Sequence, residues 1–443
     1  MSDSPVLPKE KAEVYRAEAV AVEDEAARVV GTTQLYEEDG RIRLIPMPTA
    51  DPRDPLNLPV WRKRFAVGIL CFFGALALSA EGDMFFLHER NTWMSTIISS
   101  QGVIVTALGV TKPYIAANHG WRMIYWITTG FGIVAWALLL LFLPETRWTR
   151  SKEELMGYNV YDIGPDEDRP QLDTARFRRR SIWDNVGFFN SGFEWRQAGI
   201  AMLNTLRTTL LPVVLWATAA NAAFLASTTA GSQLLSFGLL TQGWRFELMG
   251  LALLPSAFAS LLVYVFAGPV ADRISLFVTR RRNSRKGNGG NGNTRQAEDT
   301  LPNFVLPFVL GIAGVFLFGA ASQQRMHPAV LLLSAFMVTF GYLTVLPLNN
   351  VLAVESYPMW AGPVLINVSS IRIIIAFFLA SKALVWVQEK GAMATFSIYG
   401  VALMVISLGI PTLFFFGERL RAWTAGRVGH SQPAAAAARP EES

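Results

Sequence analysis

The chain has 443 residues, of which 51% are hydrophobic and only 16% are charged, and its formal net charge is +5. Charged residues make up about a quarter of an ordinary soluble domain, so this composition excludes one. The lysines and arginines gather in a few loops rather than on one face of a soluble domain, which argues against a nucleic-acid-binding protein.

Residues that commonly carry catalysis or bind metals are sparse. Cys71 is the single cysteine, so no intramolecular disulfide can form. The four histidines stand far apart and match no zinc-binding spacing, and no glycine-rich phosphate-binding loop occurs. No apolar segment combines histidine, aspartate and glutamate into a catalytic set. We therefore expect no enzyme, no metal site and no cofactor.

The N-terminal third divides into a polar part and an apolar part. Residues 1–60 lack the apolar core of a signal peptide and predict a polar N-terminal tail. Residues 61–144 begin with the basic cluster Arg62–Arg64 and predict a small helix bundle. Its three apolar segments are each long enough to cross a bilayer as a helix, and they lie at about 65–87, 94–117 and 123–143.

The remainder alternates long apolar segments with polar connections. Residues 145–207 predict a basic cytoplasmic central loop, and residues 419–443 a disordered tail. Between them, residues 208–418 predict a six-helix bundle with spans near 208–229, 247–270, 302–321, 328–348, 362–382 and 395–416. Two spans separate the central loop from a second basic loop at 271–301, so both loops can face the cytoplasm. The fold class is thus all-α, a polytopic membrane protein of about nine helices, three plus six.

The three segments before the central loop create a topological conflict. If each crosses once, Arg62–Arg64 and the 145–207 loop lie on opposite faces, against the preference of basic residues for one side. The tripeptide Gly-Trp-Arg occurs at 120–122 and again at 243–245, in two short loops. If both face outside, either the N-terminus lies outside or the first segment fails to span.

Several motifs resemble the major facilitator superfamily. Gly268–Arg273 resembles its G-x-x-x-D-R loop motif, and Pro144–Thr146 resembles the Pro-Glu-Thr signature that closes the sixth span of many members. The stretches DPLNLPxWRK, FFLHER and GWRMIYW, with Glu355–Pro358, are similar to fungal members of the drug:proton antiporter type. The resemblance implies a multi-pass carrier in the plasma membrane. It would move a small organic solute or drug by alternating access, with proton coupling in intact relatives.

The chain departs from that family in its first half. The family has six spans before the central loop, whereas this chain has room for three. Residues 65–77 resemble the start of the first span, and Asp83–Arg90 resembles the end of the fourth. Two interpretations stay open: a truncated but working carrier, or a non-transporting relative. The latter would be an inactive gene product, or a binding or regulatory partner of a full-length transporter.

Polar residues inside membrane spans are costly and therefore mark candidates for a solute pathway. The candidates for substrate binding are Arg372, Asn349, Asn350, Asn367, Trp216 and Asn221. Arg372 lies near the middle of its span. The alternative to substrate binding is that it forms a structural pair with a residue of the preceding helix. For Asn349 and Asn350 the alternative is that their amides hydrogen-bond the backbone groups left unpaired where Pro347 breaks the helix.

Charged residues supply the remaining candidates. In the family, a pair such as Asp272 and Arg273 forms cytoplasmic salt bridges that lock one face, which implies a gating role here. Glu355 stands near a loop, where an ionised role in the same gate is expected. Glu81 and Asp83 are candidates for proton coupling, because burial raises the pKa of a carboxyl group. Alternatively, both lie at the membrane surface.

Overall fold

The computed structural model describes most of the apolar part of the chain and shorter stretches elsewhere, namely residues 32–34, 48–49, 51, 54–70, 90–142, 195–241, 243–286, 294–357 and 360–428. Within these residues the fold is helical apart from one small sheet. Strand β1 (Thr32–Gln34) pairs antiparallel with β2 (Thr294–Gln296), with Thr33 opposite Arg295. The pairing ties the N-terminal region to the connection before α11.

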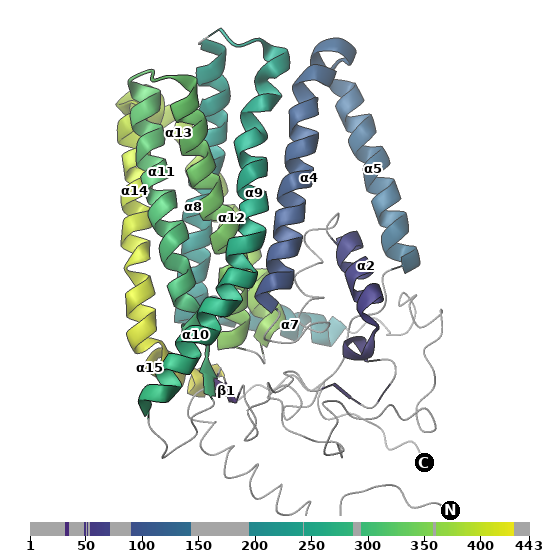
Figure 1. The fold of residues 1–443 in the computed structure, drawn as a ribbon, viewed down its shortest axis with the longest axis vertical. Helices are drawn as coiled ribbons and strands as arrows, with labels where there is room; N and C mark the ends of the chain where they lie inside the picture. The colour runs from purple at the N-terminus through teal and green to yellow at the C-terminus, as the bar shows by residue number, and fades with distance from the viewer. Residues whose placement is uncertain are drawn as a thin grey trace, which may run out of the picture.

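Figure 1 shows most of the helices running side by side along one direction, with the short helix α7 across their lower end. The α-helices are α2 (Val60–Leu70), α4 (Arg90–His119), α5 (Trp121–Phe142), α7 (Trp195–Thr208), α8 (Pro212–Thr241), α9 (Leu254–Ala267), α10 (Pro269–Lys286), α11 (Val305–Gln323), α12 (Pro328–Ser356), α13 (Ala361–Lys390), α14 (Ala392–Ser407) and α15 (Gly409–Val428). Three 3-10 helices complete them, η1 (Pro55–Asn57), η5 (Phe246–Leu253) and η6 (Ala297–Phe304).

Seven helical stretches in the described part of the chain are long and apolar enough to cross a membrane. They are Asn91–His119, Pro212–Leu240, Phe246–Arg282, Ala297–Gln323, Pro328–Ser356, Ala361–Lys390 and Ala392–Arg421. The last six match the six spans predicted for the C-terminal bundle, and the first matches the segment predicted at 94–117. The protein is therefore an all-α polytopic membrane protein. Part of the predicted central loop, however, is the helix α7.

The described helices show part of the path of the N-terminal third. Helices α2 and α4 both begin at the lower end of the bundle in Figure 1, and α5 returns to it. We call this end, where Arg280, Arg281 and Arg282 of α10 also lie, the basic end. Of the segment predicted to cross at 65–87, residues 65–70 form the end of α2, and the basic run Arg178–Arg180 of the central loop lies outside the described residues. Residues 71–89 lie outside the described residues.

Glycines turn the chain at the end opposite the basic end. Gly120, between α4 and α5, has φ 78°, and Gly243, between α8 and η5, has φ 84°. This left-handed region is open to glycine without the steric cost that other residues meet. The two Gly-Trp-Arg loops thus lie at one end of the bundle, as their shared role in the sequence suggested (Figure 1).

The core of the C-terminal bundle is built from aromatic rings packed against small residues. Phe224 of α8 is fully buried and meets Phe308 of α11 edge to face, with ring centroids 5.1 Å apart. A Cβ atom built at Gly341 of α12 would lie only 2.9 Å from the same ring. Glycine at 341 therefore lets α12 approach α8 closely enough to enclose the ring.

Helix α4 joins the C-terminal bundle through a seam of small residues. A Cβ atom built at Gly109 would lie 2.5 Å from Leu253, and one at Gly268 would lie 2.5 Å from Ser95. Further along, Ser99 donates a hydrogen bond to the carbonyl of Ser260. We call this contact the α4–α9 seam, formed by Ser95, Ser99, Gly102, Gly109, Gly250, Leu253, Ser260 and Gly268. Close approach of small residues is a principal source of helix association in lipid.

Filling the seam is expected to separate α4 from α9. In Gly102→Leu the new side chain meets Ser260, and overpacking of this kind costs about 1–3 kcal/mol. Thermal unfolding of the purified protein in lipid nanodiscs measures the loss. Gly132→Leu on α5 is the matched control, because a Cβ atom there meets nothing within 4 Å. Equal stability of the two variants would contradict a tightly packed seam.

Candidate functional site

Polar side chains gather at mid-depth in the bundle. Arg372 lies 11 residues after the start of α13, and Gln101 lies 11 residues after the start of α4. Because a helix rises about 1.5 Å per residue, both lie about 16 Å from the basic end. The hydrocarbon core of a bilayer is about 30 Å thick, so this depth is close to its centre.

A pair of buried amides joins α8 to α12 somewhat nearer the basic end, since Asn349 lies seven residues before the end of α12 and Asn221 nine residues after the start of α8, about 10–14 Å at 1.5 Å per residue. Asn349 donates its amide Nδ2 to Asn221 Oδ1 at 2.9 Å and to the carbonyl of Ala217 at 3.3 Å, and both asparagines are fully buried. One atom of each amide, Asn349 Oδ1 and Asn221 Nδ2, still has no partner in the described part of the chain. The pair thus fixes the helices and leaves one acceptor and one donor open.

The side chain of the next residue of α12, Asn350, has no hydrogen-bond partner among the described residues. Asn350 is fully buried, and neither its Oδ1 nor its Nδ2 is bonded. The neighbouring Pro347 has no N–H to offer the carbonyl of Leu343 one turn earlier. Leaving a buried amide unbonded costs about 1–3 kcal/mol, so Asn350 is not explained by the stability of the fold.

Arg372 is the one mid-depth arginine that we find among the described spans. Its side chain is half-buried, and its Nε and Nη1 atoms have no partner in the described residues. It lies close enough to Tyr342 of α12 for the guanidinium charge to act on the phenol group. The next residue of α12, Leu343, lies beside Gly102 of α4, where an added Cβ atom would be 3.6 Å from its side chain. Gln101 precedes Gly102 and therefore lies at the same level. Gln101 Nε2 is likewise unbonded among the described residues.

Buried polar atoms without a hydrogen-bond partner among the described residues therefore occur on four α-helices. We call five residues that carry such atoms the unpaired polar set, namely Gln101 of α4, Asn221 of α8, Asn349 and Asn350 of α12 and Arg372 of α13. It combines residues on both sides of the junction between α4 and the C-terminal bundle. In lipid, where water cannot serve as a partner, such groups are expected to face a solute or a water-filled path.

Asn367 and Trp216 are engaged in the fold instead. Asn367 donates to Thr208 Oγ1 at 2.6 Å and to the carbonyl of Thr205, which holds α13 against α7. Trp216 donates its indole N–H to the carbonyl of Ile406 at 2.9 Å, where α14 gives way to α15. Both side chains thus have hydrogen-bond partners in the fold, whereas the side chain of Asn350 has none among the described residues.

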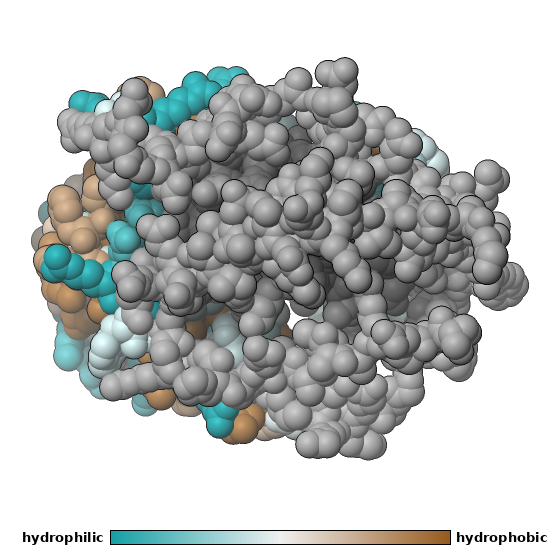
Figure 2. Space-filling model, turned by 90° about the horizontal axis from the view of Figure 1, so that it is seen from below, coloured by the Kyte–Doolittle hydropathy of each residue, from teal (hydrophilic) through white to brown (hydrophobic). Residues whose placement is uncertain are grey.

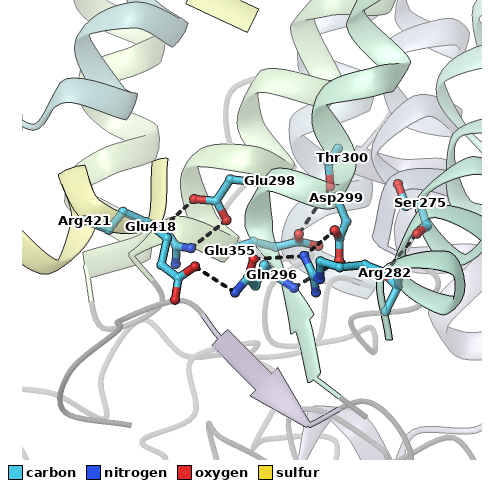
Figure 3. Close-up of polar contacts among 10 residues, drawn as sticks. Ser275, Arg282, Gln296, Glu298, Asp299, Thr300, Glu355, Glu418 and Arg421 are labelled. Atoms are coloured by element: carbon cyan, nitrogen blue, oxygen red, sulfur yellow. Dashed lines mark hydrogen bonds and ion pairs between the residues drawn. The ribbon is translucent and has the colours of Figure 1, made fainter. Parts of the chain in front are cut away.

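A cluster of ion pairs closes the basic end of the C-terminal bundle (Figure 3). Arg421 of α15 is fully buried and makes two hydrogen bonds to Glu298 of η6, at 2.9 Å and 2.6 Å. Arg282 of α10 contacts Asp299 at 2.5 Å and donates to Gln296 at 2.9 Å. Bidentate hydrogen bonds between charged groups are stronger than hydrogen bonds between neutral groups, so the cluster holds α10, η6 and α15 together.

Glu355, at the end of α12, belongs to this same cluster. It accepts a hydrogen bond from Thr300 at 3.5 Å and is buried. Burial raises the pKa of the adjacent Tyr357 above 10.0, so its hydroxyl stays neutral near Arg421 and Glu298. Seen from below, hydrophilic atoms of the described residues lie at this end beside apolar atoms of the bundle's flank (Figure 2).

Asp272 connects the two groups of helices at the basic end. Its carboxylate accepts hydrogen bonds from Asn91 Nδ2 at 2.8 Å and Thr92 Oγ1 at 2.6 Å, in the first turn of α4. A carboxylate at a helix N-terminus is favoured by the helix dipole as well. Arg273, its neighbour in sequence, is exposed. Asp272 therefore reaches across to α4 in this structure, and these two hydrogen bonds do not involve Arg273.

Comparison with known families decides the class of this bundle. Residues 63–362 match the Major Facilitator Superfamily. The chain belongs to this superfamily. That stretch includes the first five of the seven described spans, both sides of the α4–α9 seam and all of the unpaired polar set except Arg372.

Three fungal transporters of the superfamily illustrate the relationship. An uncharacterized MFS-type transporter of Schizosaccharomyces pombe is 21% identical over 403 residues, covering 79% of this chain and 66% of the relative. The MFS-type transporter tndD of Aspergillus flavipes is 24% identical, covering 70% and 54%. The probable transporter AQR1 of Saccharomyces cerevisiae is 21% identical, covering 64% and 48%. The chain spans about half to two thirds of the length of these relatives. No solved structure matches the chain.

Several site residues of this superfamily member were not among the sequence candidates. Gln101 carried a usable signal, an amide inside an apolar segment, but was not singled out. The partners Glu298 and Arg421 stand 123 residues apart and Asn91 and Asp272 stand 181 apart, so no local pattern joins them. Of the candidates, Glu81 and Asp83 lie outside the described residues.

Breaking the buried pair at the basic end is expected to destabilise the bundle. Arg421→Met leaves Glu298 buried without its partner, which costs about 3–5 kcal/mol. The double variant Arg421→Met/Glu298→Met removes both charges and should recover most of that loss. Unfolding of each variant in nanodiscs measures the difference, with the exposed Arg419→Met on the same helix as control. A double variant as unstable as the single one would show that the ion pair is not the cause.

The two kinds of asparagine are expected to respond oppositely to the same change. Asn350→Leu removes an amide that has no partner among the described residues, so stability should be unchanged or higher. Asn367→Leu removes two hydrogen bonds to α7 and should cost about 1–3 kcal/mol. Thermal unfolding of both variants in the same lipid gives the comparison. A loss of stability in Asn350→Leu equal to that of Asn367→Leu would show that Asn350 is a structural residue.

Proposed function

We propose that this protein carries a small organic solute across a membrane by alternating access. The single observation that supports the proposal most is the unpaired polar set, in which buried amide atoms and two guanidinium nitrogens have no hydrogen-bond partner among the described residues. Carriers of this kind bind substrate near the midplane between two groups of helices, which then rock about the site. Binding a solute would supply the hydrogen bonds that the fold leaves unmade.

The contacts at the basic end are the proposed gate. Asp272 bridges to the first turn of α4, while Glu355 and its neighbours join α12 to η6. We assign this end to the cytoplasm from its arginines. Opening a path from the cytoplasm requires α4 to leave α10, and so breaks the hydrogen bonds of Asp272. Arg273, exposed beside it, is proposed to meet lipid headgroups or a partner carboxylate when the gate opens.

A proton gradient is the proposed energy source, from the resemblance to drug:proton antiporters. Within the described spans, carboxylates lie toward the helix ends, as Asp272, Glu298 and Glu355 do. Glu81 and Asp83 therefore stay the proposed coupling groups. The plasma membrane is the proposed location.

A second candidate function is that of a partner subunit for a larger carrier of the same superfamily. Helix α5 supports it, because large apolar residues are exposed along the helix, among them Trp126 at 74%, Ile133 at 62% and Trp136 at 56%. A homologous bundle could cover these side chains in place of lipid.

Reconstitution of the purified chain into liposomes tests both candidates. We expect saturable uptake of solutes from a mixed panel of organic acids, amides and amines, measured by mass spectrometry of the vesicle contents. Asn350→Leu should reduce that uptake at least several-fold without unfolding the protein, and Gly132→Leu should not. Uptake that appears only after a full-length fungal relative is added, at a fixed ratio of the two chains, would favour the partner role. Uptake unaffected by Asn350→Leu would contradict the proposed path.

A further inference from the structure

We infer that the ligand of the unpaired polar set is an organic anion, a carboxylate attached to an apolar body. The inference rests on the proposed function, because it concerns the same site, and it names the class of solute. Three observations carry it: the charge of Arg372, the excess of donors in the set and the apolar residues beside it.

The guanidinium of Arg372 has no counter-charge within reach in the described part of the chain. Its Nε and Nη1 atoms are unbonded, and the described carboxylates of the spans lie toward the helix ends. An ionised side chain near the middle of a bilayer is costly unless an opposite charge accompanies it. Elsewhere in this protein, Arg421 meets that need with the two oxygens of Glu298. A carboxylate on a ligand would offer Arg372 the same geometry.

The rest of the set is rich in donors. Its unpaired atoms are five nitrogens, on Arg372, Gln101, Asn221 and Asn350, and two oxygens, on Asn349 and Asn350. Reversing an amide exchanges one donor for one acceptor, but Arg372 has donors only. An acceptor-rich ligand therefore satisfies more of these atoms than a donor-rich one. An amine would place a second positive charge beside the guanidinium and leave its donors unmatched.

Apolar side chains border the set on the side of α4. Met94 and Ile98 of α4 pack with Leu346 and Val351 of α12, and Leu343 and Tyr342 pack against these four residues. Val351 follows Asn350 directly in the sequence. Apart from the hydroxyl of Tyr342, these groups offer no hydrogen bonds to an inorganic anion such as phosphate, but they fit a hydrocarbon body. The ligand is thus expected to be amphipathic, with its charge toward Arg372 and its apolar part toward α4.

Matched solutes that differ only in charge test this inference by binding alone. The probes are benzoate, benzamide and benzylammonium, and the chain-like series octanoate, octanamide and octylammonium. Each is added to the protein in nanodiscs at pH 7, and the rise in melting temperature with concentration gives the affinity. We expect at least one of the two acids to bind, its amide at least tenfold more weakly, and its ammonium analogue not at all.

Three variants assign the binding to the guanidinium. Arg372→Gln should lower the affinity for the acid roughly tenfold to a hundredfold, as expected when a hydrogen bond to a charged group is lost. Arg372→Lys keeps the charge but loses the planar fork, so an intermediate affinity is expected. Lys382→Gln removes the same charge from an exposed site on α13 and should leave the affinity unchanged. Any variant must first show the elution profile of the unmodified protein.

Failure of this inference is separable from failure of transport. Absence of acid binding that depends on Arg372, or equal affinity for an acid and its amide, overturns the inference. If amides or amines are nevertheless taken up by liposomes, the proposed transport stands with another solute class. If the acids bind through Arg372 but no solute is taken up, the anion site stands and transport by this chain does not.

Discussion

Hydrocarbon cannot form hydrogen bonds, and this constraint determines where each polar side chain of the bundle can lie. At the basic end, where water and headgroups are near, charges are paired with charges, as Arg421 is with Glu298. Inside the bilayer, amides and indoles bond to backbone or to neighbouring helices, as Asn367 does with Thr208. The unbonded atoms of the unpaired polar set follow neither pattern, and that contrast within one protein is the reason for treating the set as a site.

The same constraint explains how α4 is attached. Apolar side chains gain little from each other in lipid, so helices associate through close packing and a few hydrogen bonds. The α4–α9 seam combines both, with Gly102 and Gly268 allowing close approach and Ser99 bonding to a backbone carbonyl. Helix α5 has no such set of contacts on most of its surface, where Tyr125 is 67% exposed and Trp126 is 74% exposed. The two N-terminal helices thus differ sharply in how firmly they are held.

The sequence predicts the C-terminal bundle well because hydropathy alone marks each crossing, and all six spans occur. Of the segment predicted at 65–87, only residues 65–70 lie in the described part of the chain, as the end of α2. The sequence predicts a loop in place of α7, since an amphipathic helix at the membrane surface lacks a long apolar run. Among site residues, polarity in an apolar span identified Asn350 and Asn367 alike. Only their partners separate them, and partners come from tertiary structure.

Binding and gating share helices, which gives a physical route between them. Helix α4 holds Asn91 and Thr92 at the gate and Gln101 at mid-depth, and α12 holds Glu355 in the cluster at its end and Asn350 about 9 Å from that end. A ligand can shift the balance of two conformations only by as much as its affinity for them differs. A solute that bonds Gln101 and Arg372 together favours the arrangement in which α4 and α13 are close. Release of Asp272 from α4 favours the opposite arrangement, so each event changes the free energy of the other.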